Sequence, residues 1–313
     1  MARAQFPDEE VDGQFERQED AFRRWIRADG SAEFPVEPGR YHLYVSLACP
    51  WASRTVVVRK LKRLESAIGM TVVDPVRDER GWAFRDGAGY SHDPINGWAF
   101  LSEAYFATEP GYRGRVTVPV LWDTRTKTIV SNSDDDIMRM FETEFDALGD
   151  GGALDLYPAK HRGEIETLNE WIYETLNNGV YKAGFATSQR AYEHAAYRVF
   201  ETLDKMEERL AERRYLVAPW PVETDWRAFM TLIRFDAVYH GHFKCNLRRI
   251  VDYPNLWGYV RDLYQYDGVA ETVDFDHIKR HYYFTHEEIN PTRIVPIGPQ
   301  LDLTSPHGRE RLP

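Results

Sequence analysis

The pattern of hydrophobic and polar positions changes character partway along the chain. Residues 41–46 alternate apolar and polar positions, which is typical of a half-buried β-strand. The next apolar residues, Val56, Val57 and Leu61, follow helical spacing. Pro50 suits the first turn of that helix, because its missing N–H costs nothing there. The pattern therefore predicts a strand followed directly by a helix that begins near residue 50.

Further strand patterns follow. Residues 70–73, 116–122 and 127–130 are strand candidates, and a short turn joins the last two as a hairpin that leads into a helix. The long stretch 74–115 is rich in glycine, aspartate and aromatic residues, so we expect a functional or interface insertion. The order β-α-β and then β-β-α predicts an α/β domain over residues 41–145.

The remainder of the chain has helical periodicity. Ile165, Leu168, Ile172 and Leu176 fall on one face of a predicted helix. Further helices are predicted over 189–213, 225–238 and 255–266. They indicate an all-α domain over residues 158–267. Residues 1–40 form a polar N-terminal arm. Residues 268–313 are rich in proline yet too apolar to be free, so we expect this tail to pack on the body.

Composition and charge argue against several classes of protein. The chain has 313 residues, a net charge of −11 and 43% hydrophobic residues, as expected for a soluble globular protein of two domains. The acidic balance argues against nucleic acid or an anionic membrane as partner. No apolar run is long enough to span a membrane, and the N-terminus does not resemble a secretory signal. Two cysteines give no disulfide framework, which favours a reducing cytoplasm.

Cys49 is the first candidate for chemistry. It lies between the predicted strand and the helix that begins at Pro50, where backbone N–H groups and the helix dipole favour an anion. Such a position is expected to lower the pKa of the thiol. Ala52 stands where a Cys-x-x-Cys motif has its second cysteine, so an external thiol would have to open a disulfide formed at Cys49. The alternative is an inert cysteine packed between strand and helix.

Pro119 interrupts an otherwise good strand pattern. A proline cannot donate to a central strand, so the position indicates either an edge strand with a trans peptide or a cis peptide. A cis peptide would expose the backbone of Val118, which could then pair with a peptide-like thiol. A cysteine at the N-terminus of a helix, followed by Val-Pro before a hairpin, is the layout of a thioredoxin-like domain.

Other clusters of reactive side chains carry less weight. His240, His242 and Cys245 are close in sequence but would not converge on one metal ion from the end of a helix. His277 and His281 share a helical face without the glutamate of a zinc-protease motif. We therefore predict no metal site.

A thioredoxin-like domain followed by an all-α domain is the glutathione-transferase layout, and several motifs narrow the resemblance. The chain closely resembles the glutathionyl-hydroquinone reductases, the Xi class of glutathione transferases, from about Phe15 to its C-terminus. The motifs are SLACPWA (46–52), GRVTVPVLWD (114–123), NNGVYKAGFATSQ (177–189), RFDAVYHGHFKC (234–245) and INPTRIVPIGP (289–299). Ordinary glutathione transferases lack the CPWA turn and the long tail.

The resemblance implies a reaction and its residues. The family reduces S-glutathionyl hydroquinones: a cysteine matching Cys49 attacks the thioether sulfur, and a second glutathione resolves the mixed disulfide. Two tyrosines that match Tyr181 and Tyr282 assist, although Tyr283 is an adjacent candidate. A tryptophan matching Trp82 packs on glutathione, whose cysteinyl part pairs with the backbone of Val118. The resemblance also implies a homodimer and a small aromatic hydroquinone conjugate as substrate.

One departure from the family pattern leaves the identity of the thiol cosubstrate undecided. Where the family has Asn-Glu-Ser to hold the γ-glutamyl carboxylate, this chain has Asn132, Ser133 and Asp134. An ionised Asp134 cannot donate a hydrogen bond and would repel that carboxylate. A sugar-based thiol such as mycothiol could then replace glutathione as cosubstrate, or these residues simply cap a helix. The alternative to an enzyme is a transferase-like protein that binds an aromatic ligand without turnover.

Overall fold

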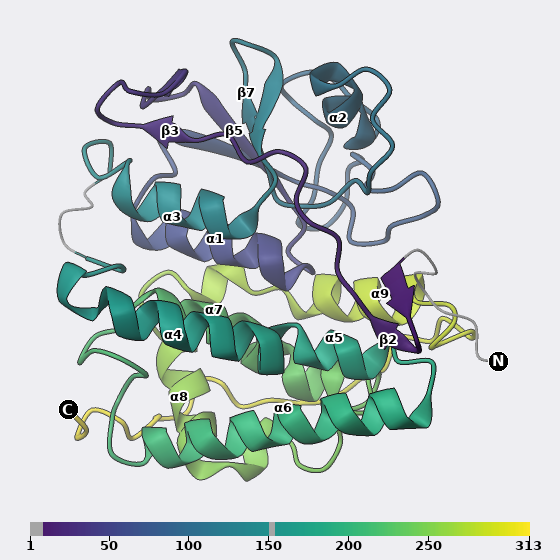
Figure 1. Cartoon of the computed structure of the whole chain (residues 1–313), viewed down its shortest axis with the longest axis vertical. Helices are drawn as coiled ribbons and strands as arrows, with labels where there is room; N and C mark the ends of the chain where they lie inside the picture. The colour runs from purple at the N-terminus through teal and green to yellow at the C-terminus, as the bar shows by residue number, and fades with distance from the viewer. Residues whose placement is uncertain (1–8, 150–153) are drawn as a thin grey trace. The chain divides into compact units, whose positions relative to one another are not determined.

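The computed structural model describes residues 9–149 and 154–313, which form two compact units (Figure 1). The first, here called the helical unit, contains the chain up to Gln18 together with Leu156–Ala270 and Tyr282–Pro313. The second, the sheet unit, contains Glu19–Asp155 and Glu271–His281. The polar arm expected over residues 1–40 is thus shared between the units.

A four-stranded mixed sheet forms the centre of the sheet unit. Its spatial order is β6-β5-β7-β8, with β5 parallel to β6 and antiparallel to β7, which pairs antiparallel with β8. The strands are β5 (Tyr41–Val45), β6 (Ile68–Val72), β7 (Val120–Asp123) and β8 (Thr128–Ser131). This is the predicted β-α-β and β-β-α arrangement of a thioredoxin-like domain.

The prediction that the first strand is half-buried is wrong. All five residues of β5 are buried. The Tyr44 ring packs against Phe84 and Trp98 of the insertion, and its hydroxyl donates to Asp93 at 2.9 Å. His42, on the same face, is hydrogen-bonded to Thr71 at 2.7 Å. The insertion therefore covers Tyr44, and His42 is paired with a residue of β6, which a local pattern does not reveal.

The sheet unit also contains the helices α1 (Pro50–Leu61), α2 (Ser102–Thr108) and α3 (Asp134–Thr143). Helices α1 and α3 pack side by side (Figure 1). Helix α2 lies in the insertion and has no counterpart in the prediction. The Val118–Pro119 peptide is cis, which confirms that alternative, and β7 begins only after Pro119.

The helical unit confirms the predicted all-α domain. Its helices are α4 (Arg162–Ile172), α5 (Gly179–Gly184), α6 (Gln189–Leu210), α7 (Glu223–Arg234) and α8 (Pro254–Tyr264). Helices α4 and α7 each continue into a π-helical turn, at Tyr173–Asn177 and Phe235–Tyr239. Short 3-10 turns occupy Ala159–His161, Ile250–Asp252 and Ala270–Thr272. Within the described residues, no helix is both long and apolar enough to cross a membrane.

A buried carboxylate fixes the start of α7. Val222 precedes the helix and offers no capping side chain, but Asp225 accepts hydrogen bonds from the backbone N–H groups of Val222 and Leu216 at 2.8 and 2.9 Å. The Tyr259 hydroxyl donates to the same carboxylate at 2.7 Å. Burial raises the pKa of Asp225 to about 6. The Asp225 carboxylate thus stabilises the start of α7 in place of an N-cap side chain.

The arm and the tail form elements of their own. The hairpin β1 (Glu10–Val11) and β2 (Gln14–Phe15) belongs to the helical unit, and the parallel pair β3 (Ile26–Arg27) and β4 (Phe34–Pro35) belongs to the sheet unit. Helix α9 (Phe275–Thr285) was not predicted; it lies in the sheet unit up to His281 and in the helical unit from Tyr282.

The end of the tail packs on the helical unit, whereas its middle is exposed. The buried Arg309 guanidinium donates to backbone carbonyls, among them that of Leu210 at 2.9 Å. Ile294 and Ile297 are 69% and 95% exposed. The expectation of a packed tail therefore describes the last residues better than the proline-rich stretch before them.

Candidate active site

Cys49 occupies the N-cap position of α1. Its backbone is extended, with φ −76° and ψ 119°, and Pro50 is the first helical residue. The backbone carbonyl of Cys49 accepts from the Ser53 N–H at 3.0 Å, while the side chain is half-buried. The thiol therefore lies at the N-terminus of a helix, where the peptide dipoles favour its thiolate form. The second cysteine, Cys245, is fully buried, and burial raises its pKa to about 12.

The backbone of Val118 lies next to the thiol. The Cys49 sulfur is 3.7 Å from the Val118 carbonyl oxygen. Val118 is buried and is followed by the cis peptide to Pro119. The sequence-predicted pair of a cysteine and a Val-Pro backbone is thus brought together in the sheet unit.

The start of α3 presents the acidic departure from the family pattern. Ser133 is the N-cap, and its hydroxyl accepts from the Asp136 N–H at 3.3 Å. Asp134 forms an ion pair with Arg54 at 2.9 Å, and Asp135 also contacts this guanidinium at 3.3 Å. The Arg54 side chain is only 1% exposed and stacks over the Trp51 ring at 4.6 Å. The negative charge that the sequence placed at this helix start is therefore compensated by a buried cation.

Arg54 was missed at the sequence level. It lies one and a half turns after Cys49 on α1, and the side-by-side packing of α1 and α3 brings it to the acids. Its position inside a helix that otherwise buries apolar and small side chains was the available signal, because a buried cation requires an anionic partner.

Trp82 is buried within the insertion of the sheet unit. Its ring stacks on His281 of α9, with centroids 5.0 Å apart and an interplanar angle of 22°. The His281 Nδ1 is hydrogen-bonded to the Pro75 carbonyl at 2.9 Å. These contacts fix the indole plane, which is what a side chain that packs flat on a ligand requires.

The helical unit holds a cluster of phenols. The Tyr181 hydroxyl on α5 is hydrogen-bonded to that of Tyr282 on α9, which in turn lies 3.0 Å from the Tyr239 hydroxyl. All three rings are buried. Burial, and then the neighbouring phenols Tyr181 and Tyr239, raise the pKa of Tyr282 well above its ordinary value, whereas Arg234 opposes the rise. The cluster thus keeps Tyr282 protonated, as a hydrogen-bond donor must be.

The arrangement separates the two adjacent tyrosines of α9. Tyr282 joins Tyr181, whereas the Tyr283 hydroxyl donates to the Ala237 carbonyl at 3.3 Å. Tyr239 was not predicted, although it lies in one of the quoted motifs. It occupies the π-helical turn after α7, a feature that often marks functional positions but that no sequence pattern announces.

His242, His277 and His281, which were considered as metal ligands, have other partners. His242 is hydrogen-bonded to His286 at 3.1 Å, and burial lowers its pKa to about 3. His277 contacts the Ala88 carbonyl at 2.7 Å. Among the described residues, no group of three or more His, Cys, Asp or Glu side chains could hold a metal ion.

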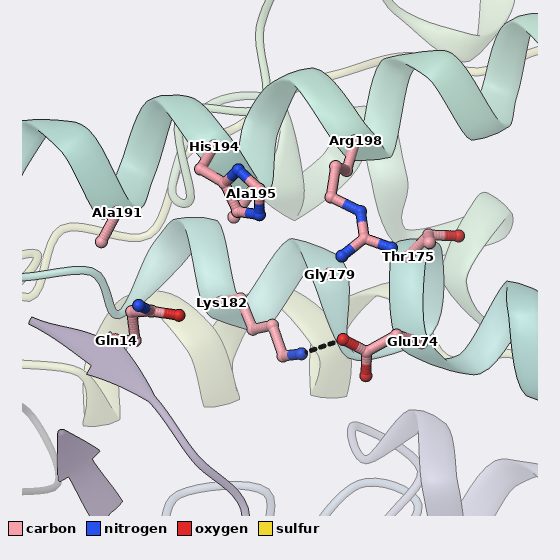
Figure 2. A pocket seen from close by; sticks show the side chains of 9 residues that line it. All are labelled: Gln14, Glu174, Thr175, Gly179, Lys182, Ala191, His194, Ala195 and Arg198. Carbon is pink, nitrogen blue, oxygen red and sulfur yellow. Dashed lines mark hydrogen bonds and ion pairs between the residues drawn. The ribbon is translucent and has the colours of Figure 1, made fainter. Parts of the chain in front are cut away.

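Figure 2 shows a cavity of about 100 Å³ on the helical unit. An ion pair between Glu174 and Lys182 crosses it, and Arg198 points toward the same glutamate. The cavity contains none of the predicted site residues. Its lining combines one acid with two fixed cations, as many solvated surfaces do, so the cavity itself implies no chemistry.

Comparisons with known proteins agree with this geometry. Residues 48–144 match the family model of the glutathione S-transferase N-terminal domain, and residues 189–262 match that of the C-terminal domain. The chain is 53% identical to glutathionyl-hydroquinone reductase YqjG of Escherichia coli, covering 95% of this chain and 93% of that protein. The glutathione-bound structure of YqjG superposes with a TM-score of 0.90, covering 93% of this chain and 96% of that one, at 52% identity.

Two further relatives extend the comparison. The chain is 50% identical to glutathionyl-hydroquinone reductase PcpF of Sphingobium chlorophenolicum, covering 93% of this chain and 91% of that protein. The structure of a Xi-class transferase from Natrialba magadii gives a TM-score of 0.91 at 51% identity, covering 93% of this chain and 89% of that one.

Proposed function

The chain belongs to the glutathione transferase family, in its Xi class, and we propose that it is a glutathionyl-hydroquinone reductase. One observation carries the proposal: a helix-N-terminal cysteine beside the Val118 carbonyl occurs in the same chain as a buried cluster of hydrogen-bonded phenols. The first group suits attack on sulfur, and the second suits the binding and protonation of a phenolic product.

The reaction has two steps. The Cys49 thiolate attacks the sulfur of an S-glutathionyl hydroquinone, so a sulfur–sulfur bond forms and the bond from sulfur to the ring carbon breaks. The electron pair stays on the ring carbon, which takes up a proton to give the hydroquinone. A second glutathione thiolate then attacks the mixed disulfide, releases glutathione disulfide and restores the Cys49 thiolate. One conjugate and one glutathione therefore give one hydroquinone and one glutathione disulfide.

Phenols are suited to the first step. Breaking the carbon–sulfur bond puts negative charge on the aromatic ring, and hydrogen bonds to the ring oxygens disperse that charge. Tyr181 and Tyr282 would donate these bonds, and one of them would relay the proton to the carbon. His281, which stacks on Trp82, and Tyr282, which joins the phenols, are consecutive residues of α9. The likeness to glutathionyl-hydroquinone reductases supports the action of both groups on one substrate.

Glutathione is the thiol that the structure favours. An uncompensated negative charge on Asp134 would disfavour glutathione, but Arg54 pairs with that carboxylate. The chain also resembles YqjG, whose structure has glutathione bound. In our proposal Ser133 and Asp134 mark the γ-glutamyl end of the ligand, Val118 pairs with its cysteinyl part, and Trp82 packs on it.

We also propose that the protein is a homodimer and that it is located in the cytoplasm. Phe106 and Ile95 of the insertion are 50% and 39% exposed, and such apolar side chains would be covered in a dimer. A reducing compartment suits a protein whose two cysteines form no disulfide within the described residues. Light scattering of the purified protein would measure its mass directly; a monomer at micromolar concentration would remove the dimer from the proposal.

Product analysis tests the function. The enzyme is mixed with a glutathionyl hydroquinone and excess glutathione, and both products are quantified by chromatography. The proposal expects hydroquinone and glutathione disulfide in equal amounts. Release of hydroquinone without glutathione disulfide, or no release with either glutathione or mycothiol as thiol, would contradict it. The last outcome together with tight binding of the conjugate would identify a binding protein.

A further inference from the structure

The N-terminal hairpin is attached to the helical unit through its turn. Gly13 has φ +81°, and its carbonyl accepts from the Thr187 N–H at 3.1 Å. A Cβ atom on Gly13 would lie 2.8 Å from the Ser188 hydroxyl oxygen. Both the backbone conformation and the close approach therefore require glycine, and they fix the turn at the start of α6.

The second strand of the hairpin then enters the aromatic core. Phe15 is only 2% exposed, and its ring meets Phe185 edge-on at 5.1 Å. Phe185 in turn contacts the Tyr181 ring at 5.8 Å. Strand β2 lies alongside α5, the helix that carries Tyr181 (Figure 1). The strand is thereby anchored within one ring of the phenol cluster.

Arg17 follows this anchor by two residues. Its guanidinium carbon is 5.0 Å from the centroid of the Tyr181 ring and 5.3 Å from that of Phe15. Its Nε donates to the Asn178 side-chain oxygen at 3.3 Å. Asn178 ends the π-helical turn before α5, and its N–H donates to the Tyr173 carbonyl at 2.8 Å. Arg17 is a half-buried residue, and its guanidinium is held by contacts with Tyr181, Phe15 and Asn178.

The charged and titratable groups near the phenols differ in which tyrosine they face. Arg234 is buried and acts electrostatically on Tyr282. His242, which lies beside the Tyr282 ring, is neutral at physiological pH because burial lowers its pKa to about 3. Among the contacts described for the Tyr181 ring, Arg17 is the cation that lies over its face.

We propose that Arg17 is a positioning residue for the reductase reaction, which the N-terminal hairpin places over Tyr181 to orient and polarise that phenol. A cation above an aromatic face is attracted to the ring and favours negative charge on its oxygen. The phenol consequently becomes a stronger hydrogen-bond donor to the charge that develops on the substrate ring. The inference rests on the proposed function, since it assigns a role within that reaction.

A purely structural role for Arg17 makes different predictions. If the guanidinium only anchored the hairpin, its loss would lower stability or substrate binding, and Phe15→Ala would have the same consequences. If it acts through Tyr181, its loss lowers kcat and leaves KM and the reactivity of Cys49 unchanged. The side-chain charge should then matter more than the side-chain shape.

The experiment compares Arg17→Gln, Arg17→Lys and the matched control Arg311→Gln, an exposed arginine of the tail. In Arg17→Gln we expect kcat to fall about tenfold, KM to stay within about twofold, and the rate of Cys49 alkylation to be unchanged. Arg17→Lys should recover most of the loss. Equal kcat values for Arg17→Gln and Arg311→Gln would overturn the inference, as would a loss confined to KM.

A second measurement does not depend on turnover. The ultraviolet absorbance of tyrosinate is followed against pH, and the contribution that Tyr181→Phe removes is assigned to Tyr181. Arg17→Gln should move this ionisation to higher pH by about half a unit, and Arg17→Lys should not. No movement would overturn the inference. Failure of the wild-type enzyme to turn over, with the movement present, would instead count against the proposed function alone.

Discussion

The two units build their functional groups in different ways. In the sheet unit, Cys49 and Ser133 each occupy the N-cap of a helix, and Val118 contributes its backbone beside a proline. These positions follow from local sequence. In the helical unit, the three phenols come from segments that lie far apart, since Tyr181 and Tyr282 are separated by 101 positions. A group made by backbone can be predicted from a short motif, whereas a group made by side-chain packing requires the whole fold.

The helical unit also shows how its phenols are aimed. One π-helical turn, Tyr173–Asn177, precedes α5 and Tyr181, and the other, Phe235–Tyr239, contains Tyr239. A π-helical turn inserts an extra residue and rotates all that follows on the helix. The two turns therefore change which side chains face the cluster, and periodicity in the sequence cannot anticipate the rotation.

The largest effect should come from the thiol of the sheet unit. Cys49→Ala removes the nucleophile, so turnover should fall by more than about a thousandfold. Cys245→Ala is the matched control, because burial raises the pKa of that thiol to about 12 and keeps it unreactive. Steady-state kinetics and alkylation followed by mass spectrometry measure both. Comparable losses in the two variants would show that the chemistry does not depend on Cys49.

A substitution in the helical unit should lower stability without altering the thiol. Asp225→Ala leaves the N–H groups of Val222 and Leu216 and the Tyr259 hydroxyl without their buried acceptor. We expect the free energy of unfolding to fall by about 3 kcal/mol. Urea unfolding measures this loss, with Asp302→Ala, an exposed carboxylate of the tail, as control. A loss below about 1 kcal/mol would contradict the role given to Asp225.

The phenols should contribute as one unit. Tyr282→Phe is expected to lower kcat about a hundredfold, and Tyr181→Phe similarly, since the two hydroxyls share a hydrogen bond. The double variant should lose little more than either single one, because a linked pair is not additive. Tyr283→Phe is the control on the same helix. Multiplicative losses in the double variant would show that the phenols act separately.

Acid should destabilise the sheet unit through His42. Burial lowers the pKa of His42 from 6.5 to about 4, so between these values the unfolded chain binds a proton that the folded chain does not. The free energy of unfolding should therefore fall by roughly 2 kcal/mol as pH drops from 6.5 to 4. Unfolding curves at several pH values, with His42→Gln as comparison, test this. An equal pH dependence in the variant would assign the effect to other groups.

The smallest effect concerns the thiol cosubstrate. Arg54→Gln leaves Asp134 and Asp135 uncompensated, and the affinity for glutathione should fall about tenfold because like charges then repel. Asp134→Asn should change affinity about twofold at most, and combining the two substitutions should restore part of the loss. Calorimetric titration with glutathione measures all three proteins. Unchanged binding in Arg54→Gln would separate this ion pair from ligand recognition.

Much of the sheet unit was accessible from sequence. The alternating pattern and Pro50 predicted β5 and the start of α1, and the interrupted strand at Pro119 gave the cis peptide as one of two alternatives, because each depends on neighbouring residues. The full burial of β5 was not accessible, since the covering insertion lies about forty positions downstream. Arg54 was also missed, because its partners lie on another helix.

Less of the helical unit was accessible. Long amphipathic helices such as α6 follow from periodicity, and Tyr181 and Tyr282 follow only from the family resemblance. Helix α9 was not predicted as an element, although His277 and His281 were placed on one helical face, and the prolines of the tail begin only at Pro291, after the helix. The contacts of Tyr239 and Arg17 depend on packing between segments remote in sequence, which no local pattern encodes.

The central claim is that the thiol of the sheet unit performs the bond-breaking step itself. The most direct test mixes the enzyme with one equivalent of a glutathionyl hydroquinone in the absence of free glutathione, and measures the intact protein mass and the released product. The account predicts one hydroquinone per active enzyme and a protein heavier by one glutathionyl group, located on Cys49. Hydroquinone release with an unmodified Cys49, or a modified Cys49 with no hydroquinone released, would contradict it.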